Sequence, residues 1–354
     1  MRTVIRGTGM FVPPHVVDNH VLAKVMDTSH EWILQRTGIV ERRYAAPGTA
    51  TSDLAVPAGR AAIENAGLTP EEINYVLFAT MTPDYYFPGS APFFQRKLGL
   101  RNLPCLDIRQ QCAAFVYGVQ LVDALIRSGA FRNVLFIGAE VHCAFMPWEC
   151  WDVLLDGAER PVSDEERASN TRFRDRLVLF GDGAGAVVFS GEPEETADGR
   201  GVIDVLTHTD GELAEKLYTP AGGSAFRPYF SPSMSERGET VPIVEGREVY
   251  KLAVTLLPEI VSRILERNGV GPDQLDLLVM HQANLRINEA VQKRLELPDE
   301  KVFNNIHKYG NTTAATIPLA LHEAREAGRL RPGDLVCFAA LGSGLNWGAA
   351  LYRC

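Results

Sequence analysis

The chain has 354 residues, of which 46% are hydrophobic and 22% are charged, so it can bury a large core, either as two ordinary domains or as one large α/β unit. Its formal net charge of -9 argues against nucleic-acid binding over a whole face, because neutralising phosphates needs basic residues. The first residues lack the apolar core of a signal peptide, and no apolar stretch approaches the roughly 20 residues that span a bilayer, so we expect a cytoplasmic protein without membrane insertion.

The first chemically suggestive segment is an apolar strand expected at 103–108 that leads into a helix expected at 113–126. Cys112 stands at this junction. A thiol at a helix N-terminus faces unpaired backbone N–H groups and the positive end of the helix dipole, and both lower its pKa. Taken alone, such a cysteine is more often structural, so the interpretation as a nucleophile depends on later motifs.

The other five cysteines form no Cys-x-x-Cys pair and no regular framework. In a large cytosolic chain most cysteines are reduced and pack as small apolar residues, which suits Cys105 and Cys337 inside their apolar runs. We expect no structural metal site.

A segment rich in tryptophan, proline and charged residues covers 141–176. We interpret it as an excursion from the core, serving as a lid or a dimer-facing loop. Trp148 and Trp151 would cover a long apolar chain of a substrate, and the segment would select this chain without supplying chemistry.

Two glycine-rich runs lie beyond the excursion, one directly after it and one near the C-terminus. Residues 181–185 lack the Gly-Lys-Ser/Thr ending of a phosphate loop and precede a strand, so we expect a turn packed against the site. Residues 342–344 occupy the corresponding place later in the chain, where small residues would let a backbone N–H approach a substrate oxygen.

His281 ends an apolar strand expected at 275–280 and precedes an amphipathic helix expected at 285–295. A histidine at a strand end is often only structural, but the polar residues 282–284 favour a site here. The other histidines lack such a setting and receive no catalytic role: His15, His20, His30, His142, His208, His307 and His322.

Asn311 follows a glycine and precedes small residues at 312–318 that suit a tightly packed helix. By itself it could be only an N-cap. Cys112, His281 and Asn311 together, however, supply a thiol, an imidazole and a carboxamide. These three groups could form one acyl-transfer site. We therefore interpret the chain as a Cys-His-Asn condensing enzyme that forms carbon–carbon bonds.

The chain also repeats itself. Residues 61–77 and 263–279 both indicate a helix, a glycine cap, a proline-led turn and a buried strand, and residues 129–138 match 328–338. Two similar α/β halves with mixed sheets covered by helices are implied.

We place the halves at 1–190, with the excursion inserted, and at 191–354. The repeat would put Cys112 of the first half and Asn311 of the second at equivalent positions.

These motifs resemble the β-ketoacyl-[acyl-carrier-protein] synthase III family of thiolase-fold condensing enzymes. The resemblance covers essentially the whole chain except 141–176. It implies a thiolase-like fold with duplicated α/β halves in five layers, α-β-α-β-α. The motifs that carry it are residues 32–42, 87–88, 112, 181–185, 281–287, 310–312 and 347–348.

The resemblance implies that Cys112 takes the acyl group while His281 and Asn311 stabilise the enolate formed as a malonyl thioester loses CO2. The backbone N–H groups of Cys112 and Ser343 would form the oxyanion hole. The implied reaction is a decarboxylative Claisen condensation of an acyl thioester, on coenzyme A or a carrier protein, with malonyl-carrier protein, as in fatty-acid initiation. It needs no cofactor and no metal ion.

The same resemblance implies a coenzyme A site in which Trp32 stacks on the adenine. Arg174 aligns with the arginine that faces this tryptophan, with Arg172 or Arg176 as alternatives. The remaining implied contacts are Thr28, Arg36, Gly246 and Asn284.

Two partners are implied as well. Phe87 matches a residue that reaches the acyl pocket of the neighbouring subunit, which implies a homodimer. Lys251, Arg286 and Lys293 would form a basic patch for the acidic acyl carrier protein, as charge steering requires, although a solvated helix face is the alternative.

The chain departs from the family pattern at three places. Gln110 and Gln111 precede the nucleophile where small residues are usual, Arg247 replaces an asparagine expected near the pantetheine channel, and the excursion at 141–176 lengthens the rim. These changes open a second interpretation, a stand-alone ketosynthase or acyltransferase of secondary metabolism, including polyketide biosynthesis, that joins two carrier- or CoA-bound chains. Asn311 favours condensation over simple acyl transfer, and the presence of all three residues argues against a non-catalytic subunit.

Overall fold

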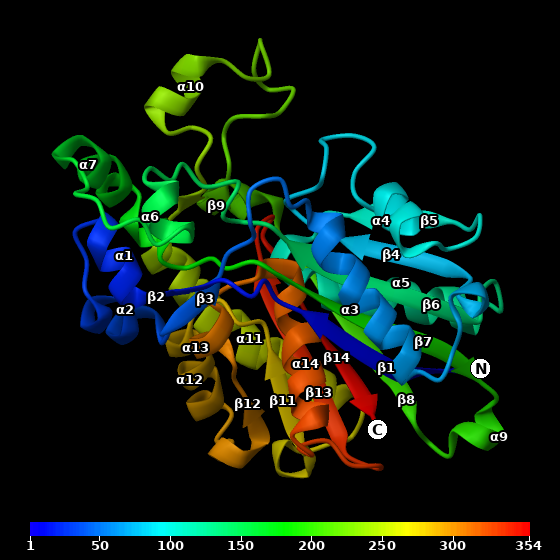
Figure 1. Ribbon diagram of the computed structural model, residues 1–354. Coiled ribbons are helices and arrows are strands. Elements are labelled where there is room, and N and C mark those ends of the chain that lie inside the picture. Colours follow the sequence, from blue (N-terminus) through cyan, green and yellow to red (C-terminus); the bar gives the residue numbers. More distant parts are fainter.

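Two five-stranded sheets with the same strand order form the framework of the structure, a computed structural model that describes residues 1–354 (Figure 1). In both sheets the first three strands are antiparallel neighbours and the last three are parallel. The first sheet is ordered β1 (Arg2–Phe11), β7 (Gly183–Glu192), β6 (Asn133–Glu140), β4 (Tyr75–Ala79) and β5 (Cys105–Ile108). The second is ordered β8 (Gly201–Thr209), β14 (Asn346–Arg353), β13 (Leu335–Gly342), β11 (Leu277–Met280) and β12 (Val302–Phe303).

Helices complete a five-layered arrangement. Helices α5 (Ala114–Arg127) and α14 (Thr316–Glu326) contact strands of both sheets and form the central layer. The outer layers contain α3 (Thr51–Asn65) and α4 (Ala91–Leu98) on the first sheet, and α11 (Gly246–Arg267) and α12 (Leu285–Arg294) on the second. The duplicated, thiolase-like α/β fold predicted from the sequence is thereby confirmed, whereas the division at residue 190 stays a prediction.

The central layer is held by aromatic packing across both sheets. Phe115 of α5 makes edge contacts with Phe136 of the first sheet, at 5.3 Å between ring centroids, and with Phe338 of the second, at 5.2 Å. All three rings are fully or almost fully buried. Burying an aromatic side chain of this size contributes about 1.5–3 kcal/mol each, so this cluster fixes where α5 begins relative to both sheets.

Two equivalent tight turns precede the central helices. The 3-10 turns Gln111–Ala113 and Thr313–Ala315 both begin on a residue with positive φ, 43° at Gln111 and 47° at Thr313. Cys112 therefore corresponds to Ala314, and the predicted equivalence of Cys112 with Asn311 is wrong. The error arises because α5 has 14 residues and α14 only 11, so the match at the helix ends does not extend to the helix starts.

The segment 141–176 connects β6 to β7 and contains α6 (Trp151–Leu155), α7 (Asp164–Arg172) and the start of α8 (Arg174–Leu177). Trp148 is only 5% exposed and packs 5.9 Å from Tyr44, within the same core as α3. Neither Trp148 nor Trp151 lines the large cavity described below, so the interpretation that they cover an acyl chain is wrong. Both indole rings pack against the hydrophobic core of the first half.

A second projection, not anticipated from the sequence, lies between β9 (Leu217–Tyr218) and β10 (Ile243–Val244). This arm, residues 219–242, includes α10 (Pro232–Arg237) and extends away from the sheets (Figure 1). Its Phe230 is 61% exposed.

The remaining elements are short, and one of them, α2 (His30–Thr37), contributes to the rim of the cavity. No helix combines the length and the apolar character needed to cross a membrane. The short elements are β2 (Val16–Asp18), α1 (Asn19–Val25), α2 (His30–Thr37), β3 (Glu41–Arg43), α9 (Glu194–Ala197) and α13 (Ile306–Tyr309).

Candidate active site

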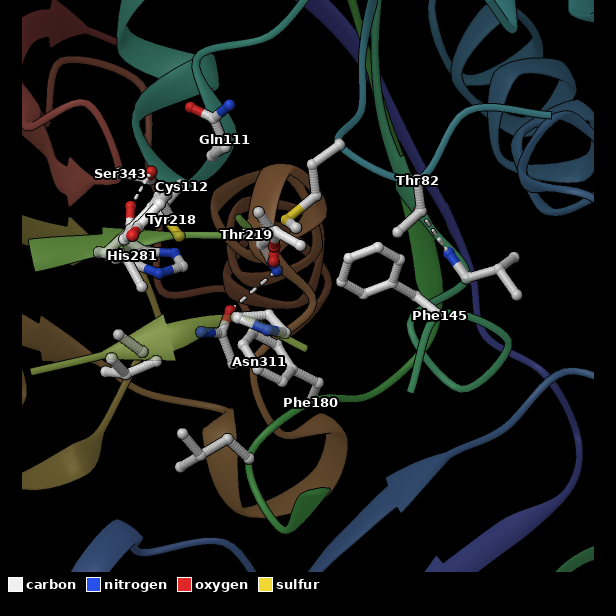
Figure 2. Close-up of a pocket in the computed structure, with 18 of the residues that line it drawn as sticks. Thr82, Gln111, Cys112, Phe145, Phe180, Tyr218, Thr219, His281, Asn311 and Ser343 are labelled. Carbon is white, nitrogen blue, oxygen red and sulfur yellow. Dashed lines mark hydrogen bonds between the residues drawn. The ribbon is translucent and has the colours of Figure 1, made fainter. Parts of the chain in front are cut away.

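A cavity of about 1210 Å³ opens between the two halves, and the three predicted catalytic residues line it. Cys112 stands in the turn before α5, His281 directly after β11, and Asn311 shortly after α13. Figure 2 shows the sulfur of Cys112 directed toward the His281 ring, with Asn311 pointing into the same cavity. The fold thus brings together side chains that are up to 199 positions apart in the sequence.

Cys112 lies against the end of β13. A Cβ atom added to Gly342 would lie 2.7 Å from the Cβ of Cys112, so only glycine permits this approach. The next residue is Ser343, whose hydroxyl donates to the Leu217 carbonyl. The backbone N–H groups of Cys112 and Ser343 donate to no other residue of the protein. Two free donors beside the sulfur are what an oxyanion hole requires.

The thiol of Cys112 is harder to ionise than the sequence suggested. Burial, and to a smaller degree the Glu140 carboxylate, raise the pKa of Cys112 to about 12, although its own backbone N–H and, less strongly, the Thr313 side chain partly offset this. The predicted lowering of this pKa is therefore wrong for the free protein. Helix α5 begins only at Ala114, and the desolvation of the turn outweighs the helix dipole.

His281 is a buried, neutral imidazole. Burial lowers its pKa to about 3, because the charged form would lose its hydration. Its Nδ1 atom lies 2.7 Å from the Thr316 hydroxyl oxygen, while Nε2 is buried without a hydrogen-bond partner. The free ring nitrogen is available to a substrate atom.

Asn311 is held on three sides. Its backbone N–H donates to the Leu179 carbonyl at 2.8 Å, its carbonyl accepts from Gly181 at 3.2 Å, and its Oδ1 accepts from the Thr313 N–H at 2.9 Å. The side-chain amide Nδ2 therefore keeps both of its protons for a ligand. The glycine run at 181–185 serves this anchoring, since a Cβ at Gly181 would lie 2.2 Å from the Tyr309 carbonyl oxygen.

Glu140 is a buried carboxylate beside the site, behind the cavity lining, that sequence reasoning missed. It ends β6, is fully buried and accepts hydrogen bonds from Thr80, Met81 and Thr82. Burial raises its pKa to about 7. A charged residue at the end of an otherwise apolar strand was the signal that could have revealed it.

The mouth of the cavity contains most of the predicted coenzyme A contacts. The guanidinium carbons of Arg36 and Arg174 lie 4.4 and 4.6 Å from the centroid of the Trp32 ring. Of the three candidate arginines, Arg174 alone faces this ring, because Arg172 lies over Phe173 and Arg176 donates to the Pro242 carbonyl.

Other predicted contacts differ in their settings. Gly246 and Asn284 line the cavity, and the Asn284 amide already donates to the Arg36 carbonyl at 3.0 Å. Thr28 does not line the cavity, and its hydroxyl is buried without a partner.

The residues predicted to meet partners lie outside the cavity. Phe87 is 83% exposed and does not line the cavity of its own chain. Lys251 and Lys293 are exposed on α11 and α12. Arg286 is partly committed to its own protein, since it pairs with Glu289 at 2.8 Å and donates to the Gln35 carbonyl at 2.9 Å.

Comparison with known proteins assigns the family. Two models described as 3-oxoacyl-[acyl-carrier-protein] synthase III match residues 106–211 and, as its C-terminal part, 265–354. The β-ketoacyl-[acyl-carrier-protein] synthase III of Caldanaerobacter subterraneus is 39% identical over 99% of this chain and 97% of its own length. The chain belongs to the β-ketoacyl-[acyl-carrier-protein] synthase III family. It is therefore a condensing enzyme of the acyltransferase class, as the sequence predicted.

Solved structures of β-ketoacyl synthase III relatives agree with this assignment. The Aquifex aeolicus 3-oxoacyl-[acyl-carrier-protein] synthase III superposes with a TM-score of 0.83 at 38% identity, over 99% of this chain and 100% of the other. The priming β-ketosynthase of the R1128 polyketide pathway superposes with a TM-score of 0.82 at 28% identity, over 99% and 96% of the two chains. Both alignments extend through the segment 141–176, which the resemblance had left out.

Proposed function

We propose that this enzyme condenses an acyl thioester with malonyl-[acyl carrier protein], giving a β-ketoacyl product and CO2. The observation that carries the proposal is the grouping of Cys112 with two unused polar atoms, Nε2 of His281 and Nδ2 of Asn311, in one cavity. A thiol supplies a nucleophile, and two aimed donors supply the stabilisation that decarboxylation needs.

In the first half-reaction the sulfur of Cys112 attacks the thioester carbonyl carbon. The new S–C bond forms as the bond to the coenzyme A sulfur breaks, and the free N–H groups of Cys112 and Ser343 hold the transient oxyanion. The thiol proton is lost to water in the cavity, and the departing coenzyme A thiolate takes a proton from water. The acyl group then remains on Cys112 as a thioester.

In the second half-reaction the malonyl thioester loses CO2, and the electrons of the broken C–C bond form an enolate. Its oxygen accepts hydrogen bonds from Nε2–H of His281 and Nδ2–H of Asn311. Nε2 carries the proton when the single Thr316 hydroxyl proton points to Nδ1, at 2.7 Å, and not to the Thr313 carbonyl oxygen, at 3.1 Å; the shorter separation favours Nδ1. The enolate carbon attacks the acyl thioester, and the Cys112 sulfur leaves as a thiolate that is reprotonated by water.

The proposal also includes the molecules that this enzyme binds. The malonyl group arrives on an acidic acyl carrier protein that docks at Lys251, Arg286 and Lys293, and the donor arrives on coenzyme A, which is a substrate and not a resident cofactor. Phe87, exposed on its own subunit, reaches the acyl pocket of a second copy in a homodimer. The reaction takes place in the cytoplasm.

A role in priming secondary metabolism is the second candidate. The 28% identity to a polyketide priming ketosynthase and the large cavity, into which Phe145 of the 141–176 segment reaches, favour donors longer than two carbons (Figure 2). The chain length of the donor distinguishes this role from fatty-acid initiation.

Incubation with a series of acyl-CoA donors and malonyl-carrier protein, followed by mass spectrometry of the carrier protein, tests the proposal. We expect one CO2 lost for each acyl group gained, on the carrier protein. Transfer of the acyl group with the malonyl carboxylate retained would instead indicate an acyltransferase that does not condense.

Recognition of the adenine gives a separate prediction. Arg174→Ala should raise KM for acyl-CoA about five- to tenfold with little change in kcat. The Arg174 guanidinium, whose carbon lies 4.6 Å from the centroid of the Trp32 ring, would hold the adenine against that ring, and a contact this far from the reacting atoms acts on the ground state and the transition state alike. Arg172→Ala, whose guanidinium lies over Phe173, is the matched control. A truncated acyl thioester that lacks the nucleotide should be used equally well by both variants, and a parallel loss on it would remove Arg174 from the adenine site.

A further inference from the structure

Arg42 is a fully buried cation to which neither the sequence analysis nor the mechanism above gives a role. It stands in the middle of β3, and all of its side-chain hydrogen bonds go to uncharged oxygen atoms. Burial lowers the pKa of Arg42 to about 10, which still leaves the guanidinium charged at neutral pH. Apolar residues often replace buried charges without loss of stability, so packing alone does not explain an arginine here.

The guanidinium joins two segments that are far apart in the sequence. Nη1 donates to the Val17 carbonyl at 3.1 Å and to Asn19 Oδ1 at 2.9 Å, at the junction of β2 and α1. Nη2 donates to the Val178 carbonyl at 2.9 Å, directly after α8. Because the guanidinium is a rigid planar fork, these bonds fix the separation between the two segments.

Val178 leads in both directions to a residue of the site. Its backbone N–H donates to the Arg174 carbonyl at 3.2 Å, and the Arg174 guanidinium faces Trp32. On the other side, the carbonyl of Leu179 accepts from the Asn311 N–H at 2.8 Å. The position of Val178 therefore affects both the adenine contact and the donor to the enolate.

The side chain of Arg42 also packs against the turn that carries Asn311. A Cβ atom added to Gly181 would lie 3.0 Å from the Cβ of Arg42, and one added to Gly310 would lie 3.5 Å from it. The N–H of Gly181 donates to the Asn311 carbonyl at 3.2 Å. Arg42 thus supports the backbone around Asn311 by packing as well as through Val178.

We propose that Arg42 is a positioning residue, which by holding Val178 sets both the adenine contact and the aim of the Asn311 amide. The nucleophile should not depend on it, because Cys112 and its oxyanion donors belong to the turn before α5 and to the end of β13. The inference rests on the proposed function in taking Asn311 as a donor to the enolate.

Hydrogen exchange of the full-length enzyme, followed by mass spectrometry of peptides, tests this positioning. In Arg42→Met we expect the amide hydrogens of Asn311 and Gly181 to exchange about tenfold faster than in the wild type, because the segment that pairs with them has lost its anchor. Peptides from α5 should exchange at the wild-type rate. Arg43→Met is the matched control, since Arg43 is the next residue of β3 and pairs with Glu41 at 2.8 Å.

The two half-reactions give a second readout. Arg42→Met should slow malonyl decarboxylation about tenfold and raise KM for acyl-CoA about threefold, because both contacts are misplaced. Acylation of Cys112 by a thioester that lacks the nucleotide should keep its kcat. Unchanged exchange at Asn311, faster exchange along the whole chain, or an equal loss in every assay would overturn the inference.

Arg42→Lys separates the charge from the fork. One ammonium group cannot reach both segments, so this variant should show the same pattern as Arg42→Met with smaller effects. If Arg42→Met does not fold, an Arg42→Lys enzyme that folds and matches the wild type in both readouts would overturn the inference equally. Hydrogen exchange requires no turnover, so failure of the proposed function would appear separately, as absence of CO2 release by the wild-type enzyme.

Discussion

Cys112→Ala should abolish formation of the acyl-enzyme, with a loss of at least about 10⁴-fold in condensation. Cys112 is the only cysteine that lines the cavity. The two free N–H groups lie beside its sulfur, so they can stabilise an oxyanion only where Cys112 is the nucleophile. Donors for the enolate are untouched by this change. We therefore expect the variant to keep measurable malonyl decarboxylation while losing acyl-CoA-dependent labelling.

Cys105→Ala is the matched control for this experiment. Cys105 is also partly exposed, but it lies in β5 outside the cavity, so its removal should leave labelling unchanged. Peptide mapping of the labelled protein identifies the acylated residue. Acyl groups found on Cys143 or Cys150, both buried in the core of the first half, would overturn the assignment of the nucleophile.

The catalytic trio could be predicted because each member stands where one local pattern changes into another. The strand expected at 275–280 and the helix expected at 285–295 are β11 and α12 within a few residues, and His281 lies between them. The helix expected at 113–126 is α5, which begins two residues after Cys112. Apolar periodicity is a local property of the sequence, so the chain itself locates these junctions.

Properties that depend on distant segments could not be predicted in this way. The pKa of Cys112 is set by burial against residues from the other half and by Glu140, and the sequence gives no measure of either. The choice of Arg174 over its neighbours depends on which side of the short helix α8 meets α2, which periodicity over so few residues cannot resolve.

The 141–176 segment illustrates the same limit of local reasoning. Its length and composition suggested a lid, yet Trp148 packs against Tyr44 from a segment about 100 residues earlier. Replacing residues 143–170 by a flexible linker would therefore remove part of the core and not only a donor-selecting surface. A point substitution at Phe145, which does line the cavity, is the sharper probe of acyl-chain preference.

His281→Ala and Asn311→Ala should each slow malonyl decarboxylation by about 10²- to 10³-fold, the usual cost of removing one donor to a developing oxyanion. Acylation of Cys112 should fall far less, because its oxyanion is held by backbone N–H groups that neither variant alters. Asn311→Asp should be slower still than Asn311→Ala in decarboxylation, since it replaces the amide donor by a carboxylate that repels the enolate.

The two half-reactions can be timed separately, by CO2 release from malonyl-carrier protein and by single-turnover labelling with acyl-CoA. His208→Ala is the matched control, because His208 is partly exposed, stacks on Trp347 and lies outside the cavity. Equal collapse of both half-reactions in His281→Ala and Asn311→Ala, with His208→Ala unaffected, would contradict the division of labour. In that event His281 Nε2, left unpaired beside the sulfur, would have to take part in forming the acyl-enzyme itself.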